Sequence, residues 1–372
     1  MSDWGASGRQ DVFELSLVDP FTLKDVGGEL SMVAGDGSVT WGYGTDNIAT
    51  ASFTLVRGEN ADVDDPFAWT RLVRLRHTCT LPDGEEETEV LGTFFVDSCP
   101  VKAVHGVERM SASCYSTMLR FSANGLTYDW SRPKGYAIVE SIRDLVEAGG
   151  GLLSVDADVN EEATHGRSMT FEIDTNQKEA LDTVAGWYGL EIGVDDLGYI
   201  TLSNYVAPAY RAASYDFEEG ENCVYVAGYT LDDDNSDRVN RVTYWYSRET
   251  KDDDDELPLS SSATAELPQA YAYSYYNIGR WVDYSEEVND PVEDAELLVL
   301  AEEYLYANCD ESRYIEIEHA GVPGLRAGDV VTYRNSEDGE SSLAVKCLVS
   351  EMDMSLKPGC PCKTLLKVVR EL

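Results

Sequence analysis

The first 115 residues alternate between apolar and polar side chains in short runs, and this pattern limits the fold more than any other feature. Such alternation puts the apolar side chains on one face of a strand. Turn residues such as Pro82–Gly84 separate the runs, as they do in hairpins. Six or more antiparallel strands with no helix between them predict a barrel or a sandwich. The expected strands are Val12–Val18, Ser38–Tyr43, Ala49–Val56, Leu72–Thr80, Glu89–Val96 and Val107–Tyr115, with Gly35–Gly37 as a turn.

Near residue 116 the pattern changes to one of helices and short strands. Tyr136–Ala148 carries apolar residues at helical spacing and is followed by three glycines, which favour a helix end. Asp174 predicts the N-cap of a second helix, with Gln177 at its third position. This helix is expected to end at Gly189, and a hairpin then covers Leu190–Leu202. Residues 116–205 are therefore expected to form an α+β insert.

Strand patterns return at Cys223–Tyr229 and Arg238–Tyr246, and a second insertion follows them. The segment from Asp252 to about residue 268 is acidic and rich in Ser and Ala, which predicts a mobile surface loop. Asp290, followed by Pro291, predicts the start of a helix that runs to about residue 308. Beyond this helix the chain again has the pattern of strands.

The stretch Tyr314–Tyr333 has the form of a strand, a double turn and a second strand. Proline fixes its own φ, and glycine accepts a positive φ without steric cost. Pro323-Gly324 and Ala327–Asp329 supply these residues in the order that two successive turns require. The stretch is therefore expected to be a β-hairpin.

Together these patterns predict an α+β chain that is mainly β. We expect two antiparallel β-barrel-like domains, an α+β insert and a smaller insert that contains one helix. A length of 372 residues is sufficient for several domains. The expected domains are residues 1–115 for the first barrel, 116–205 for the α+β insert, 206–256 with 310–372 for the second barrel, and 257–309 for the small insert.

The net charge of −41 restricts the partners of this chain. Binding of nucleic acid requires clustered Lys and Arg, so no stable nucleic-acid binding is expected. Repulsion from anionic lipids also argues against membrane contact. The charge fits three interpretations: solubility, a salt-loving host, or a non-adhesive wall around a passage for DNA.

No targeting or membrane segment is expected. The N-terminus lacks the basic and apolar regions of a signal peptide, and no run approaches the roughly 20 apolar residues of a membrane span. The eight cysteines are scattered along the chain and are expected to be free thiols in a reducing cytoplasm. They are Cys79, Cys99, Cys114, Cys223, Cys309, Cys347, Cys360 and Cys362.

No motif predicts a catalytic site. Asp232–Asp237 fails as a calcium loop, because Asp237 stands where Gly is needed and Thr243 stands where Glu is needed. Asp252–Asp255 is expected to be a solvated run of charge. Ser131–Lys134 matches the Ser-x-x-Lys spacing of penicillin-recognising enzymes, but the partner motifs of those enzymes are absent.

Histidines and cysteines also form no recognised metal motif. His77, His105, His165 and His319 lie far apart, and Cys360-Pro-Cys362 is too tight for the usual zinc knuckle. A Cys–His pairing through space stays open. Tyr271–Tyr276, with Trp281 and Tyr284, fits either a sugar- or peptide-binding surface or tyrosines packed at an interface. We therefore predict no catalytic residue, no cofactor and no metal.

The order of several segments resembles the tail hub family of long-tailed phages, which includes the central hub protein of contractile baseplates and the N-terminal structural part of tail-associated lysins. No single segment is specific, and the resemblance lies in their order along most of the chain. The segments are Leu91–Asp97, Val107–Leu119, Asn176–Leu202, Arg238–Asn240, Pro323–Val331 and Val349–Leu356.

This resemblance implies a structural, non-enzymatic protein that forms a homotrimeric ring with two barrels from each subunit. It implies contacts with the tail tube or distal tail protein, the tape measure protein and the tail fibre or tip. It also implies assembly in the host cytoplasm and a final place in the virion. Lysin-bearing relatives continue into a further domain, so no hydrolytic activity is expected for a chain that stops at Leu372. The alternatives are a cell-wall-degrading endopeptidase or glycan hydrolase and a carbohydrate-binding surface protein.

Overall fold

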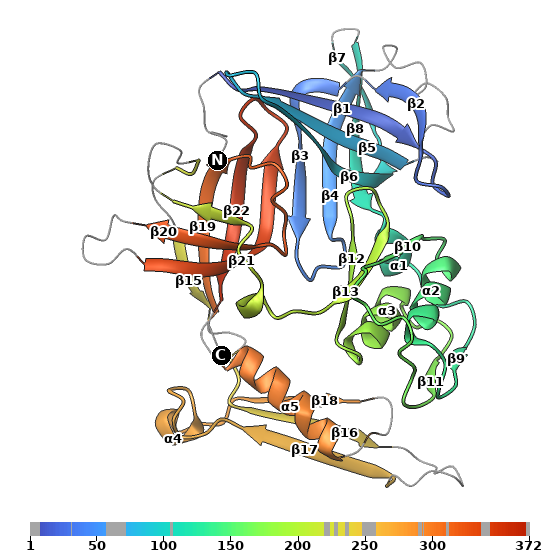
Figure 1. The fold of residues 1–372 in the computed structure, drawn as a ribbon, viewed down its shortest axis with the longest axis vertical. Helices are drawn as coiled ribbons and strands as arrows, with labels where there is room; N and C mark the ends of the chain where they lie inside the picture. Colours follow the sequence, from blue (N-terminus) through green and yellow to red (C-terminus); the bar gives the residue numbers. More distant parts are fainter. Residues whose placement is uncertain are drawn as a thin grey trace. The chain divides into compact units, whose positions relative to one another are not determined.

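The computed structural model of the protein is mainly β, with helices in the middle of the chain and near its C-terminal third (Figure 1). It falls into two compact units, one made of Met1–Tyr229 with Glu316–Leu372 and the other of Thr230–Ile315. The expected fold class, α+β and mainly β, is confirmed. The structure describes residues 8–30, 32–56, 72–104, 107–218, 224–226, 230–234, 238–247, 258–288, 292, 294–309, 312–335 and 343–369.

The N-terminal region is a set of antiparallel strands, as the alternation predicts. Apolar side chains such as Leu15, Phe53 and Leu75 point into its core and are almost completely buried. Gly35–Gly37 is not a separate turn but lies within β3, where the pairing with β4 is irregular and Gly35 has a positive φ. The strands are β1 (Gln10–Val18), β2 (Asp25–Leu30), β3 (Met32–Gly42), β4 (Ala49–Val56), β5 (Leu72–Thr80), β6 (Glu86–Ser98), β7 (Val101–Val104) and β8 (Val107–Ser116).

Residues 119–204 form an α+β region around one apolar core. Helices α2 and α3 bury Ile142, Leu145 and Leu181 in it, at the helical spacing seen in the sequence. The expected N-cap is wrong by two residues. Asn176 caps α3, because its side chain accepts hydrogen bonds from the backbone N–H groups two and three residues further along. The elements are α1 (Leu119–Ser122), β9 (Trp130–Arg132), α2 (Ile138–Ala148), β10 (Leu153–Val155), β11 (Met169–Phe171), α3 (Gln177–Gly186), β12 (Leu190–Val194) and β13 (Ile200–Asn204).

The C-terminal strands join the N-terminal strands in one sheet. The long strand β21 pairs with β20 through its first half and with β3 through its second half, and β22 lies alongside it. From β19 onward the sheet order is β19-β22-β21-β3-β4-β8-β6-β5-β1-β2, and β7, β14 and β20 pair at its side. Closure of this sheet into a barrel is not detected in the described part of the chain. The elements are η2 (Pro208–Tyr210), β14 (Tyr215–Phe217), β19 (Ser312–Ala320), β20 (Val330–Asn335), β21 (Leu343–Ser355) and β22 (Pro361–Val368).

The double turn at residues 322–329 forms as expected, but the hairpin does not. The N–H of Leu325 donates to the Val322 carbonyl, and the N–H of Asp329 donates to the Arg326 carbonyl. Gly324 and Gly328, one in each turn, have φ values of 78° and 94°. β19 pairs with β22, whereas β20 pairs with β14 and β21. The double turn therefore carries the chain from one part of the sheet to another.

The unit Thr230–Ile315 contains a small sheet of its own, in the order β17-β16-β18. Helix α5 packs on this sheet through Ala301 and Leu305, against Val242 and Ala265. The sequence interpretation grouped Arg238–Tyr246 with the second barrel, and the structure pairs this strand with β17 and β18. The elements are β15 (Thr230–Asp234), β16 (Arg241–Ser247), β17 (Ser260–Glu266), α4 (Tyr275–Ile278), β18 (Asp283–Glu287) and α5 (Asp294–Asn308).

The expected mobile loop is wrong for Ser260–Glu266, which is strand β17. Every residue of this strand pairs with β16, so the main-chain hydrogen bonds of a sheet order a segment with few apolar side chains. Residues 252–257 and the expected helix start at Asp290 lie outside the described residues. Helix α5 ends at Asn308, as expected.

Candidate functional site

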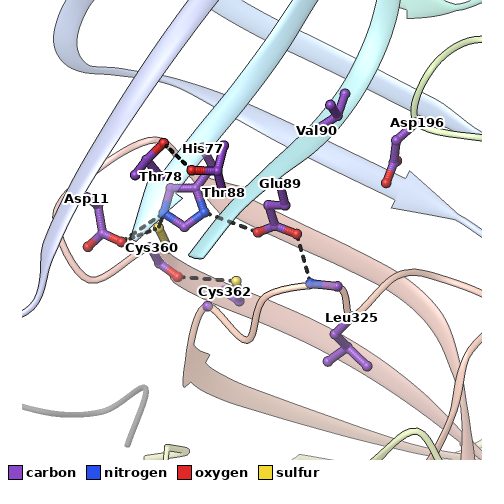
Figure 2. Close-up of polar contacts among 12 residues, drawn as sticks. Asp11, His77, Thr78, Thr88, Glu89, Val90, Asp196, Leu325, Cys360 and Cys362 are labelled. Atoms are coloured by element: carbon purple, nitrogen blue, oxygen red, sulfur yellow. Dashed lines mark hydrogen bonds and ion pairs between the residues drawn. The ribbon is translucent and has the colours of Figure 1, made fainter. Parts of the chain in front are cut away.

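A cluster of charged and polar side chains lies largely buried in the larger unit, where strands β1, β5 and β6 meet segments from the C-terminal part of the chain (Figure 2). We call this cluster the polar junction. Such a concentration of buried charge requires paired partners, because an isolated charge is costly to remove from water. Its members are Arg9, Asp11, His77, Glu89, Asp196, Arg326 and Cys360.

Strand register brings Asp11, His77 and Glu89 together. Phe13 lies opposite His77 in the β1–β5 pair, so Asp11 is the diagonal neighbour of His77 on the same face. Glu89 lies directly opposite His77 in the β5–β6 pair. A register shift between Leu75 and Arg76 sets this alignment. Three side chains that are distant in the sequence therefore face one another.

His77 is the centre of the junction. Its Nε2 lies 2.8 Å from Asp11 Oδ1, and its Nδ1 lies 3.1 Å from Glu89 Oε1. Burial disfavours the charged imidazolium, but the hydrogen bonds to Asp11, Cys360 and Glu89 outweigh that effect and raise the pKa of His77 to about 11. His77 is therefore a cation between two carboxylates.

Asp11 is held from three sides, and its side chain is 0% exposed. Burial raises the pKa of this carboxyl, but His77, the backbone N–H of Gly359 and Arg9 together lower it well below its usual range. The Gly359 N–H donates to Oδ2 over 2.6 Å, and Arg9 Nε donates to Oδ1 over 2.8 Å. Arg9 Nη1 also donates to the carbonyl of Gly321, so one arginine links strand β1 to the start of the double turn.

The double turn that the sequence predicts is the second wall of the junction. The N–H of Gly324 and Arg326 Nη2 both donate to Glu89 Oε2, over 2.8 and 2.9 Å. Arg326 also lies 3.2 Å from Asp196 Oδ2 and stacks its guanidinium over the Trp41 ring. Burial raises the pKa of Glu89, but His77, Arg326 and the Gly324 N–H outweigh it, so Glu89 stays ionised. The turn is thus tied to the N-terminal strands by charge-assisted bonds.

The α+β region reaches the same place through the hairpin turn between β12 and β13. Arg74 Nη2 donates to the Leu197 carbonyl over 3.0 Å. The hydroxyl of Thr93 donates to the Asp196 carbonyl, and that of Thr117 donates to the Gly198 carbonyl. Three regions of the larger unit therefore meet at the polar junction.

Cys360 gives the junction a thiol. Its Sγ lies 3.3 Å from His77 Nε2 and 3.4 Å from Asp11 Oδ1, and its φ of 45° is unusual for a residue other than glycine. Cys360, His77 and Glu89 have the order of a nucleophile, a base and an orienting carboxylate. However, Cys360 is completely buried, and burial raises the pKa of its thiol. A buried, protonated thiol favours a structural role over nucleophilic attack.

The other residues that the sequence singled out do not converge on the junction. Ser131 lies exposed on β9, where its hydroxyl accepts from Thr170, and Lys134 is exposed in the following turn. His165 is buried between Ser141 and Tyr188, and burial lowers its pKa. Tyr275 stacks on Trp281 in the smaller unit, and Tyr276 is exposed. Asn235–Asp237, Asp252–Asp255, His105 and Cys223 lie outside the described residues.

Sequence reasoning missed the junction because its members are far apart in the sequence; Asp11 and Cys360, for example, are separated by 349 positions. One signal was present: His77 takes an inward position in the alternating strand 72–80, where an apolar residue is the usual choice.

Seven of the cysteines are free thiols in the described part of the chain, and the eighth, Cys223, lies outside it. No helix of the described part is both long and apolar enough to cross a membrane.

The fold is shared with solved phage tail proteins. A tail protein from Neisseria meningitidis MC58 matches with a TM-score of 0.63 and 12% identity, over 95% of this chain and 96% of that chain. The 43 kDa tail protein of prophage MuSo2 from Shewanella oneidensis matches with a TM-score of 0.62 and 14% identity, over 97% and 98%.

A secretion-system protein has the same fold. The E. coli c3393 protein, a component of the type VI secretion system that is similar in structure to the T4 tail proteins gp27 and gp5, matches with a TM-score of 0.52 and 7% identity. That match covers 96% of this chain and 77% of the other. No protein-family model and no curated protein sequence matches the chain. The resemblance expected from the order of segments is confirmed at the level of the fold.

Proposed function

Because this chain has the fold of phage tail proteins, we propose that it is a structural protein of a phage or prophage tail, located in the hub at the distal end of the tail tube. The observation that carries the proposal is the extent of the shared fold. The match to two tail proteins covers at least 95% of this chain and at least 96% of each of those chains. A match over the whole length includes both β regions, the α+β region and the smaller unit.

The proposed form of the hub is a homotrimer. Two β regions in each subunit would give three subunits a pseudo-six-fold ring, which suits the junction between a six-fold tube and three-fold distal parts. The pairing of β21 with β3 supports this arrangement, because it fixes the two β regions of one subunit in a single sheet. The division into four domains expected from the sequence stays a prediction, and the compact unit Thr230–Ile315 is proposed as an appendage to the hub.

The proposed partners are other tail proteins: the tail tube or distal tail protein, the tape measure protein, and the fibre or tip. The protein would assemble in the host cytoplasm and act in the virion. A net charge of −41 supports a lumen that does not bind DNA, since like charges repel the phosphate backbone. Stable nucleic-acid binding and membrane insertion have no part in this proposal.

A structural role is proposed in place of an enzymatic one. The thiol–histidine pair of the junction is buried, which supports this choice. No observation on the described residues favours the endopeptidase, glycan hydrolase or carbohydrate-binding alternative.

Two experiments test the proposal at separate levels. Light scattering over a concentration series, with negative-stain electron microscopy, should find a trimer and a ring with a central hole. A strict monomer at high concentration with no ring would contradict the trimer.

Immunogold labelling of phage particles from an induced host should place the label at one end of the tail, and label that is absent from tails would contradict the tail role. Clearing of host cell walls in a zymogram would favour the enzyme instead.

A further inference from the structure

Three donor atoms in the polar junction have the spacing of a metal-binding site. His77 Nε2 lies 2.8 Å from Asp11 Oδ1 and 3.3 Å from Cys360 Sγ, and the last two atoms are 3.4 Å apart. All the ligand atoms lie within 4.8 Å of one another. A triangle of this size allows one ion to lie about 2 Å from all three atoms, which is the bond length of zinc to its protein ligands.

The chemistry of the three donors selects the kind of ion. Imidazole nitrogen, carboxylate oxygen and thiolate sulfur together suit zinc and similar divalent transition metals, whereas calcium and magnesium prefer oxygen ligands alone. Three protein ligands leave one tetrahedral position for a further donor. Cys79 lies opposite Asp11 in the strand register and is buried, so the fourth donor would be its thiol or a water molecule.

The surroundings already hold the ligands in the orientation that a metal requires. Glu89 accepts from His77 Nδ1, which directs Nε2 toward the other two donors. A carboxylate behind a metal-binding histidine is the usual arrangement around zinc. The Gly359 N–H holds the second oxygen of Asp11. Cys360 has a φ of 45°, in the left-handed region that is uncommon for a residue other than glycine.

Metal binding also preserves the balance of charge. A divalent ion would replace one proton on the His77 imidazolium and one on the Cys360 thiol, and two protons would leave to solvent. The net charge of the cluster is the same before and after. Arg9, which donates to Asp11 Oδ1, and Arg326, which donates to Glu89, therefore keep their counter-charges.

We propose that Asp11, His77 and Cys360 bind one zinc-class divalent metal ion. The ion would join strands β1 and β5 to the segment that precedes β22, and so would cross-link residues 283 to 349 positions apart. Such a link stabilises the folded chain, because the unfolded chain has no preformed site. This proposal departs from the sequence-based expectation of no metal, and it does not depend on the proposed tail function.

The first test measures metal content. The full chain, expressed in zinc-supplemented medium and desalted without chelator, should contain about one zinc ion per chain by elemental mass spectrometry. Cys360→Ser should reduce the content at least fivefold. Cys347→Ser is the matched control, since Cys347 is another completely buried free thiol outside the cluster, and it should retain the metal.

The second test uses cobalt as a spectroscopic substitute. Wild-type protein that has been stripped with chelator and then given Co²⁺ should show a thiolate-to-cobalt charge-transfer band and the strong visible bands of tetrahedral cobalt. Both should disappear in Cys360→Ser and persist in Cys347→Ser, with folding of each variant checked by circular dichroism. Absence of the bands in folded wild-type protein, or their survival in folded Cys360→Ser, would overturn the proposal.

Discussion

The polar junction and the core of the α+β region are both largely buried parts of the larger unit, yet different forces hold them. The core consists of apolar side chains such as Trp130, Ile142 and Leu181, and its stability comes from excluded water and close packing. The junction consists of ion pairs and hydrogen bonds around His77. Packing tolerates many apolar side chains of suitable volume, whereas a charged cluster requires particular partners in particular positions. A single substitution should therefore have different consequences in the two regions.

The largest effect is expected from Glu89→Ala. This change removes the acceptor shared by His77, the Gly324 N–H and Arg326, and leaves the buried Nδ1 of His77 without its partner. Breaking a buried charge pair on one side costs about 3–5 kcal/mol. The measurement is urea unfolding followed by circular dichroism, in the presence of chelator so that metal has no influence. Glu86→Ala, an exposed residue of the same strand, is the control. A cost below about 1 kcal/mol would mean that the junction contributes little to stability.

A similar or slightly smaller effect is expected from Leu181→Ala in the apolar core. Leu181 is completely buried on α3, and loss of its methyl groups should cost about 2–5 kcal/mol through lost burial and the cavity that remains. Leu181→Met should cost less stability than Leu181→Ala, because methionine restores the lost volume. No such recovery through volume is expected at Glu89. Leu197→Ala is the control, because that side chain is 43% exposed in the same region. Equal unfolding midpoints for Leu181→Ala and Leu197→Ala would contradict the assignment of the core.

His319 is a buried histidine with neutral partners, whereas the partners of His77 are carboxylates. This difference should appear in the pH dependence of stability. His319 Nδ1 lies 2.7 Å from the Ala320 carbonyl, which only accepts, so Nδ1 carries the proton and Nε2 accepts from the Thr364 hydroxyl. Burial lowers the pKa of His319 to about 4, and the hydrogen bond to Ala320 opposes this only in part.

Because this folded-state pKa lies below the ordinary value of 6.5, the unfolded chain binds the proton first. The stability from His319 is present above pH 6.5 and is lost as the pH falls toward 4, by up to about 3 kcal/mol. In His319→Gln this part of the acid dependence should disappear. The check is the difference in unfolding free energy between wild type and variant at pH 7 and at pH 4.5. A difference that does not change with pH would show that the pKa of His319 is the same in the folded and unfolded chains.

The contrast between the two regions also explains what the sequence could predict. Ile138, Ile142 and Leu145 repeat at helical spacing, so α2 and its buried face follow from local pattern. Strands β4 and β5 have the limits that alternation predicts, Ala49–Val56 and Leu72–Thr80. Local pattern fails to predict an element where pairing with a distant segment determines the structure. Ser260–Glu266 is a strand because β16 pairs with it, although its own side chains offer little apolar surface.

The candidate site could not be predicted for the same reason. Asp11, His77 and Cys360 become neighbours only through the register of β1 with β5 and through the turn before β22. The double turn at residues 322–329 was predicted from Pro323, Gly324 and Gly328, but not its partner. The contacts of Gly324 and Arg326 with Glu89 depend on the arrangement of the whole sheet. Sequence patterns thus predict elements, and the structure is needed to show which charges meet.

The smallest effect is expected from Arg143→Ala, which removes ion pairs of the same chemistry at the surface. Arg143 Nε lies 3.2 Å from Glu140 Oε1 on the same helix, and its side chain is 32% exposed. Water screens this pair and the side chains lose entropy in forming it, so the change should cost less than about 0.5 kcal/mol and nothing measurable at high salt. The measurement is urea unfolding at low and high salt, beside Glu89→Ala. If Arg143→Ala proved as costly as Glu89→Ala, burial would not be what makes the polar junction strong, and the contrast between buried and exposed ion pairs in this chain would fail.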